Sequence, residues 1–278
     1  MIVKTRQPRG VLRPALAQGA FEHVRRLPSA ALAGVVEHYW YVAWDLRGLP
    51  PQLQETLPHP NVQLVAERGG ARVYGVHTER FVRRLEGRDH VFGVKFKAGG
   101  FHPFFGMPVS AIADRSLAAQ DVFGAAATAF AEDVLGAADM EQRVAGAERF
   151  LLARLLARAA RPDANVERAG ALVAAIAGDL GLTSVQRLTA TSGLDKRALQ
   201  RLFQKYVGIG PKWVIQRYRL HEAVAQMQAG VPVGWTELAL ALGYFDQTHF
   251  IRDFRKLVGQ SPAEYARSLA SAGQQGGN

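Results

Sequence analysis

Residues 243–256 read GYFDQTHFIRDFRK, and this stretch determines how the C-terminal third of the chain is interpreted. Phe250, Phe254 and Leu257 recur at helical spacing, so we expect one apolar stripe along a single helix. Glycine accepts the left-handed backbone conformation that a tight turn requires, so Gly243 is expected to end a preceding short helix. The stretch therefore predicts a helix, a turn and a second helix whose other face is polar.

An earlier part of the chain has the same layout. Residues 185–214 and 235–265 each contain a glycine, a phenylalanine, a second glycine and a proline in the same order. In both units the phenylalanine lies five residues before the second glycine, and that glycine lies three residues before the proline. The distance from the first glycine to the phenylalanine is ten residues in the first unit and eleven in the second. Because such self-similarity is stronger evidence than a single motif, it predicts two helix-turn-helix units, with the second turn one residue longer.

The second helix of each unit, expected over 195–206 and 246–258, has a polar face suited to reading DNA. Arginine can bind guanine with two hydrogen bonds, and glutamine can do the same with adenine. A recognition helix presents its N-terminal residues to the base edges. The candidate DNA-binding residues are Arg197, Gln200, Arg201 and Gln204 in the first unit, and Gln247, Thr248, His249 and Arg252 in the second.

Residues 211–228 are predicted to form one helix between the units, because proline is tolerated in a first turn. About 18 residues of helix measure about 27 Å, so this spacer could hold two recognition helices about 34 Å apart, which is one turn of DNA. Thr183 and Gln186 are spaced as a capping box at the start of the first unit. The polar face of a single helix is usually only solvated, but two related helices on a rigid spacer favour DNA binding.

Charge and composition are consistent with this interpretation. The chain has 34 Lys and Arg against 24 Asp and Glu, and residues 182–267 hold 12 against 6. An excess of cations favours polyanions such as DNA, although charge alone decides little. The absence of cysteine excludes disulfides, thiolate nucleophiles and cysteine-based zinc sites, and suits a reducing, cytoplasmic location. There is no apolar run of about 18 residues and no secretory signal pattern, so no membrane association is expected.

The N-terminal half of the sequence has a different residue pattern, typical of short strands. Short aromatic or β-branched runs at 35–44, 61–67, 71–74 and 90–96 are separated by turn signals, and they predict a small antiparallel sheet or barrel. Helical patterns follow at 125–135 and 140–160, and a proline-containing linker is expected at 161–165. We therefore expect an α+β chain with a β-rich domain with trailing helices over 1–160, a DNA-binding domain over 161–270 and a disordered tail over 271–278. Residues 1–20 are expected to form a loose arm.

Residues 182–267 resemble the AraC/XylS-type transcriptional regulators. The likeness is carried by Gly243–Lys256, by GQSP at 259–262 with Tyr265, and by LQRLF at 199–203 with GIGP at 208–211. It implies a seven-helix domain in which both recognition helices enter successive major-groove segments of double-stranded DNA, and a protein that works with the transcription machinery. Trp235 departs from the family pattern, which usually has a smaller β-branched residue there, and we expect Trp235 to pack.

Residues 34–125 are similar, more weakly, to a sensor domain found in a subset of these regulators. EHYW at 37–40, LPHPN at 57–61, Gly75 and VKFKAGG at 94–100 carry that similarity. It implies a cupin-like fold that can bind a small-molecule effector. Aromatic residues can line such a pocket, although they are more often core, and the ligand-binding candidates are Trp40, Trp44 and Phe101.

Other kinds of site find little support in the sequence. His38, His59, His77 and His102 match no metal-ligand spacing, so neither a metal nor another cofactor is expected. Phosphate-loop and nucleophile-elbow motifs are absent, so the chain is not expected to be an enzyme. The alternative is a metal-dependent cupin-like enzyme, or a ligand-binding protein, that its C-terminal module targets to DNA. The leucine-rich helix at 140–160 is expected either to pack on its own sheet or to form a homodimer interface.

Overall fold

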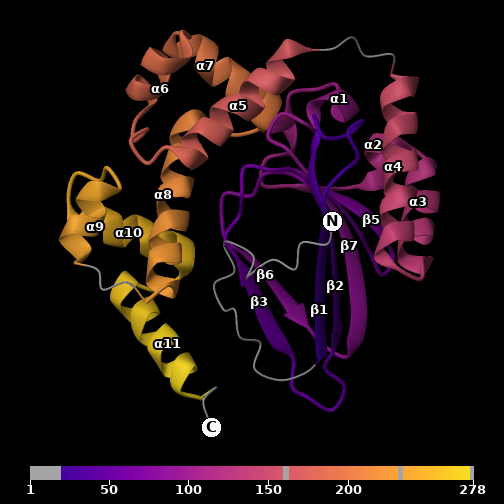
Figure 1. The fold of residues 1–278 in the computed structure, drawn as a ribbon, viewed down its shortest axis with the longest axis horizontal. Helices are drawn as coiled ribbons and strands as arrows, with labels where there is room; N and C mark the ends of the chain where they lie inside the picture. The colour runs from indigo at the N-terminus through magenta and orange to yellow at the C-terminus, as the bar shows by residue number, and fades with distance from the viewer. Residues whose placement is uncertain (1–19, 159–162, 231–233, 276–278) are drawn as a thin grey trace.

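The computed structural model describes residues 20–158, 163–230 and 234–275. Figure 1 shows a part built of β-strands with helices on one side and a helical part arranged around the long helix α8. The chain therefore has an α+β fold, as the sequence predicts. The expected loose arm over residues 1–20 lies outside the described residues except for Ala20, which begins the first strand.

The described strands form one six-stranded sheet, in the order β1-β2-β7-β4-β5-β8, and a separate two-stranded sheet of β3 and β6, with every pairing antiparallel. The sequence patterns predicted β2, β4, β5 and β7 but missed the other four strands. The bounds are β1 Ala20–Arg26, β2 Val36–Asp45, β3 Gln52–Thr56, β4 Gln63–Glu67, β5 Gly70–Tyr74, β6 Phe81–Leu85, β7 Arg88–Phe96 and β8 Ser116–Ala118.

Helices cover one face of the larger sheet (Figure 1). The helices here are α1 His102–Phe105, the 3₁₀ turn η1 Val109–Ile112, α2 Ala119–Phe123, α3 Ala126–Gly136 and α4 Met140–Ala157. The main core of this domain lies between the sheet and these helices, and its fully buried members include Tyr39, Phe92 and Phe96. Burial of each such aromatic side chain contributes about 1.5–3 kcal/mol, so this layer holds the β-domain together.

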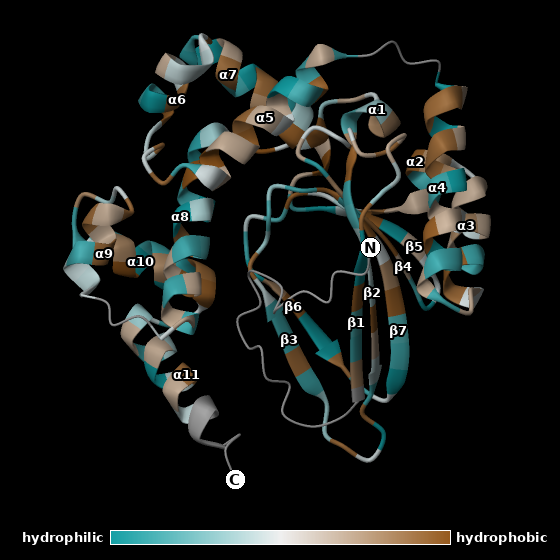
Figure 2. Cartoon of the chain, in the orientation of Figure 1, coloured by the Kyte–Doolittle hydropathy of each residue, from teal (hydrophilic) through white to brown (hydrophobic). Residues whose placement is uncertain are grey.

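The other face of the larger sheet turns toward the two-stranded sheet of β3 and β6. Apolar contact between the two sheets is provided by a smaller core in which Leu85 of β6 packs with Trp44, Val65 and Val91. Figure 2 shows that β3 and β6 carry both hydrophilic and hydrophobic residues. The two strands do not alternate cleanly between buried apolar and exposed polar residues, because Leu53 is exposed whereas Glu55 is buried and pairs with Arg80.

The C-terminal part consists of helices in the described residues. Their bounds are α5 Ala164–Gly178, α6 Val185–Ser192, α7 Lys196–Leu202, the π-helical turn η2 Phe203–Val207, α8 Pro211–Gln228, α9 Trp235–Ala241, α10 Gln247–Val258 and α11 Pro262–Gln275. Helix α8 has the bounds that the sequence predicts, with proline in its first turn. The prediction of a disordered tail over residues 271–278 is wrong for residues 271–275, because α11 continues to Gln275.

Helix α8 is shared by two separate cores. Val214 and Ile215 in its N-terminal half pack with α6 and α7. Leu220, Val224 and Met227 in its C-terminal half pack with α9, α10 and α11. Each helix-turn-helix unit is therefore fixed to its own half of one helix about 27 Å long.

Capping side chains define where the recognition helices begin. Asp195 accepts a hydrogen bond from the main-chain nitrogen of Ala198 at 2.7 Å, and Asp246 accepts one from that of His249 at 2.7 Å. The capping box predicted from Thr183 is wrong by one residue, because Ser184 is the N-cap of α6 and accepts from the nitrogen of Arg187. Each such cap supplies an acceptor to a nitrogen that the helix itself leaves without one.

Candidate nucleic-acid interface

The first recognition helix keeps most of its predicted polar face in solvent. Arg197, Gln200 and Arg201 are exposed, whereas Gln204 is half-buried. The α-helix ends earlier than predicted, at Leu202, and the chain continues as a π-helical turn in which the nitrogen of Gly208 donates to the carbonyl oxygen of Phe203 at 2.8 Å. Gln204 lies in that wider turn and is less accessible than the other three.

The second recognition helix has a more clearly divided surface. Thr248 and Arg252 are exposed, and the side chain of Arg252 is 72% exposed. Gln247 is half-buried and accepts a hydrogen bond at 3.0 Å from the Thr236 hydroxyl of α9. His249 is half-buried and lies 3.6 Å from the carboxylate of Asp253, one turn further on. The four predicted residues therefore occupy the first half of α10, with Arg252 and Thr248 the more accessible pair.

The sequence analysis did not single out two arginines that are buried on α8. Arg219 is 2% exposed and donates to the carbonyl oxygens of Leu180 and Leu182 in the loop before α6. Arg217 is 3% exposed and its guanidinium lies over the ring of Trp213, 4.7 Å from its centre. Burial lowers the pKa of Arg217 to about 9. Both guanidinium groups serve structure and neither is available to DNA.

The β-domain contacts the second unit through two of its loops. Leu57 is buried within the core formed by α8 to α11, and the carbonyl oxygen of the next residue, Pro58, lies 3.2 Å from Nε2 of His221 on α8. Arg80 donates to the carbonyl oxygen of Val258, the last residue of α10, at 3.0 Å, and pairs with Glu55 at 3.2 Å. The C-terminal end of the second recognition helix is thus held by the β-domain.

The β-domain also contacts the first unit. Its η1 turn packs against η2, and Val109 lies so close to Gly208 that a β-carbon there would come within 2.9 Å of the valine side chain. The ring centres of His102 and Tyr206 are 4.5 Å apart. Both helix-turn-helix units are therefore touched by the same β-rich domain, through residues other than the predicted recognition residues.

The structure separates one of the three aromatic residues considered for ligand binding, Phe101, from the other two. Phe101 is 2% exposed and packs among Phe96, Phe104 and Phe123 in the main core. Trp44 is 5% exposed and belongs to the smaller core on the opposite side of the sheet, where Trp40 packs beside it. The expectation that these three line one pocket does not hold, because the two tryptophans share one face of the sheet, whereas Phe101, which follows β7 and precedes α1, is buried in the core on the other face.

A group of ionisable side chains lies on the sheet near Trp40. Lys95 on β7 pairs with Glu37 at 3.0 Å, and Nδ1 of His38 lies 3.5 Å from the same carboxylate. Burial alone would raise the pKa of Glu37, but hydrogen bonds and charge from His38 and Lys95 lower it to about 2. Burial lowers the pKa of His38 and that of Lys95, with Glu37 opposing both shifts.

The histidines considered as metal ligands do not gather. Throughout the described ranges, no three His, Asp or Glu side chains lie together in a way that could hold a metal ion. His59 lies beside His221, with ring centres 4.3 Å apart, at the contact between the β-domain and α8. His102 lies beside Tyr206 at the other contact between the domains. None of the helices described has the length and apolar character needed to cross a membrane.

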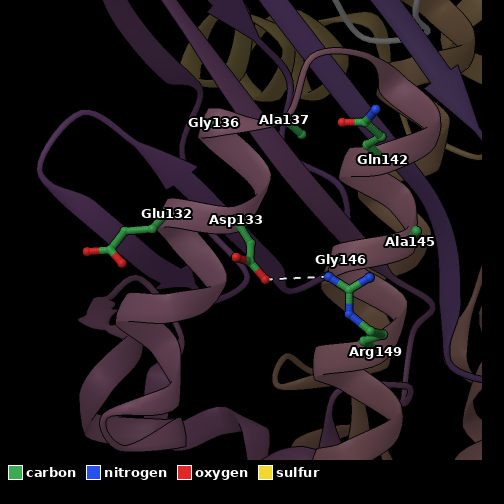
Figure 3. A pocket seen from close by; sticks show the side chains of 8 residues that line it. All are labelled: Glu132, Asp133, Gly136, Ala137, Gln142, Ala145, Gly146 and Arg149. Atoms are coloured by element: carbon green, nitrogen blue, oxygen red, sulfur yellow. Dashed lines mark ion pairs between the residues drawn. The ribbon is translucent and has the colours of Figure 1, made fainter.

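Hollows on the β-domain are open and polar. One groove of about 480 Å³ lies between α3 and α4 (Figure 3). Asp133 and Arg149 face each other across it, with an oxygen-to-nitrogen distance of 3.5 Å. Effector pockets are usually largely apolar and enclose most of their ligand, so this groove has neither property of such a pocket.

Comparisons with known proteins assign the C-terminal unit. Residues 188–268 match a family model described as a helix-turn-helix domain, and residues 24–118 match one described as a domain of unknown function, DUF6597. The chain is also 25% identical over 84 residues to the HTH-type transcriptional regulator MtrA of Neisseria gonorrhoeae, a match that covers 30% of this chain and 28% of that regulator. The matched part therefore spans less than a third of the curated relative.

Solved structures of ToxT from Vibrio cholerae are similar to the whole chain only at a distance. An apo ToxT variant gives a TM-score of 0.36 at 11% identity, covering 88% of this chain and 100% of its own. A second ToxT structure gives a TM-score of 0.38 at 9% identity, and the match covers 89% of this chain and 97% of the ToxT chain. The assignment therefore depends on the matched sequence and on the two capped, paired units around α8. By these criteria, the C-terminal third of the chain contains a helix-turn-helix domain, over residues 188–268.

Proposed function

We propose that this protein is a sequence-specific transcriptional regulator that reads two successive major-groove segments of double-stranded DNA. The observation that carries the proposal is the pair of helix-turn-helix units, each packed on its own half of α8. The exposed polar residues on α7 and in the first half of α10 are of the types that read base edges. Phosphate contacts from the basic surface of this domain add affinity that depends on salt.

The proposed division of labour follows the domains. Residues 161–270 bind DNA, and residues 1–160 act as a sensor or dimerisation domain. The base-reading residues are Arg197, Gln200, Arg201, Gln204, Gln247, Thr248, His249 and Arg252. Gln204 is the weakest member of this set, because it is half-buried in the π-helical turn.

We further propose that a small-molecule effector bound by the β-domain controls DNA binding. The β-domain contacts the first unit through η1 and the second unit through Leu57 and Arg80. A ligand that alters the β-domain can therefore alter how the two units are held relative to each other. Such a ligand must favour one arrangement energetically, because a ligand with equal affinity for both arrangements shifts nothing. Homodimer formation and contact with the transcription machinery belong to the same proposal.

Selection of bound fragments from random duplex DNA tests the proposal. The purified full chain should enrich fragments that share two conserved blocks whose centres are about 10 base pairs apart. A matched control is the double variant Arg201→Ala with Arg252→Ala, whose two side chains are exposed and whose fold should persist. The proposal fails if the full chain enriches no sequence, or enriches the same sequences as the double variant.

A further inference from the structure

The two helix-turn-helix units differ by one residue in their turns. Gly193 and Gly243 both adopt left-handed conformations, with φ of 66° and 77°. Gly193 is the C-cap of α6, and Gly243 directly follows Leu242, the C-cap of α9. The next N-cap residue is Asp195 in the first unit and Asp246 in the second. One residue separates glycine from aspartate in the first turn, and two separate them in the second.

The extra residue can be identified from burial. Leu194, the single residue in the first turn, packs partly buried against the core of its unit. Tyr244 is 8% exposed and packs in the core of the second unit, so it takes the corresponding place. The remaining residue is Phe245, which is 90% exposed. The longer turn therefore adds a phenylalanine that contributes nothing to the core.

The position of Phe245 distinguishes it from an ordinary exposed apolar residue, since single ones are common on soluble proteins. It directly precedes Asp246, the N-cap of α10, and so lies at the N-terminal end of the recognition helix, the end that reads base edges. The second unit lies at the edge of the molecule, with α9 on the far side of α8 from the sheets (Figure 1). This leaves the turn open to a large partner such as DNA.

We propose that Phe245 is a specificity-determining residue that contacts the C5-methyl group of a thymine in the major groove read by the second unit. This inference rests on the proposed DNA-binding function and deepens it. An apolar side chain at a base edge recognises thymine through that methyl group, because the other three bases present polar atoms or hydrogen there. Contact with DNA also removes the exposed ring from water, which favours the bound state.

The test replaces each thymine of the selected DNA site, one at a time, by deoxyuridine, which lacks only the methyl group. The dissociation constant is measured for the full chain and for Phe245→Ala. Burial of about one methylene group corresponds to roughly a four-fold change in affinity. Replacing one particular thymine by deoxyuridine should therefore weaken DNA binding by the unchanged chain by about that factor. The same substitution should have no effect on Phe245→Ala.

Two further variants show whether the response requires an apolar side chain at position 245. Leu240→Ala removes another exposed apolar side chain of the same unit, on α9, where Leu240 is 58% exposed, and should still respond to the missing methyl group. Phe245→Leu keeps an apolar side chain and should retain most of the response. Circular dichroism of each variant checks that the helices are intact.

The response of the two proteins to deoxyuridine decides whether Phe245 reads a thymine. One thymine at which uracil weakens the unchanged chain but leaves Phe245→Ala unaffected supports the inference. Equal responses of the two proteins at every thymine overturn it, as does normal DNA affinity of Phe245→Ala. If the full chain selects no DNA sequence, the proposed function fails and this inference fails with it.

Discussion

Arg217 of helix α8 donates a hydrogen bond from Nη2 to the main-chain carbonyl oxygen of Thr78, at 2.9 Å, and so joins the spacer of the DNA-binding domain to a loop of the β-domain. Two of its other nitrogens, Nε and Nη1, are buried and have no hydrogen-bond partner among the described residues. The loop itself is held by Asp114, which accepts from the nitrogen of Thr78 at 2.6 Å. A buried charge with one hydrogen bond is thus placed where the two domains meet.

Methionine substitutions of the two buried arginines should affect stability unequally. Arg219→Met leaves the carbonyl oxygens of Leu180 and Leu182 without their donor, and loss of hydrogen bonds from a charged group costs about 1.5–3 kcal/mol. Arg217→Met removes one hydrogen bond but also removes a buried charge that has few hydrogen-bond partners. Its loss in free energy of unfolding should therefore be at least ~1 kcal/mol smaller than that of Arg219→Met. Urea unfolding of both variants measures the difference, and the opposite order would contradict these structural roles.

Alanine substitution of exposed arginines should relax DNA specificity at single positions. Arg201→Ala in the first unit and Arg252→Ala in the second are each expected to weaken binding to the selected site by about 1–3 kcal/mol. Each loss should come from one base pair, because a bidentate arginine reads one guanine. Binding to a panel of single-base variants measures this. Uniform weakening on every sequence would instead identify the residue as a phosphate contact.

Removal of the N-cap of α10 should destabilise the second unit. Asp246→Ala leaves the main-chain nitrogen of His249 without its acceptor, and loss of a cap costs about 1 kcal/mol. Asp246→Asn is the matched control, since asparagine caps helices about as well as aspartate. Chemical unfolding compares the two variants. Equal stability of both with the unchanged chain would show that the cap does not stabilise α10.

Stability should fall in acid in two stages that have different origins. Burial lowers the pKa of His38 from 6.5, so below that pH the unfolded state binds more protons and the free energy of unfolding decreases. The pKa of Glu37 is lowered from 4.5 to about 2, so its contribution is present above pH 4.5 and is lost as the pH falls toward 2. His38→Gln should reduce the first stage, to which His23 also contributes because burial lowers its pKa to about 4, and Glu37→Gln should reduce the second. Urea midpoints measured across this pH range check the assignment, and unchanged slopes in both variants would refute it.

Local signals made the helical domain predictable. Proline in the first turn and the phenylalanine spacing placed α8 and α10 within one residue of their observed bounds. The start of α6 was misplaced because Thr183 and Ser184 are both good caps, and only the geometry chooses between them. As predicted, Trp235 packs, and it does so against its own unit.

The strands and domain contacts were harder to predict from the sequence. β3 and β6 are short and rich in polar residues, as in QLQET and FVRRL, so no apolar run marks them. The contacts made by Arg217 and Arg80 end on main-chain carbonyl oxygens, which every residue has, so no sequence pattern identifies the acceptor. The aromatic set of Trp40, Trp44 and Phe101 failed as a pocket for a related reason, since composition does not say which face of the sheet each ring takes.

Hydroxyl-radical footprinting of the full chain on its selected DNA site reports directly on whether both units bind the duplex. If both recognition helices enter neighbouring major grooves, two protected segments should appear on one face of the duplex, with centres about 10 base pairs apart. Arg201→Ala and Arg252→Ala should each weaken a different segment. A single protected segment, or two segments on opposite faces of the DNA, would contradict binding by both units.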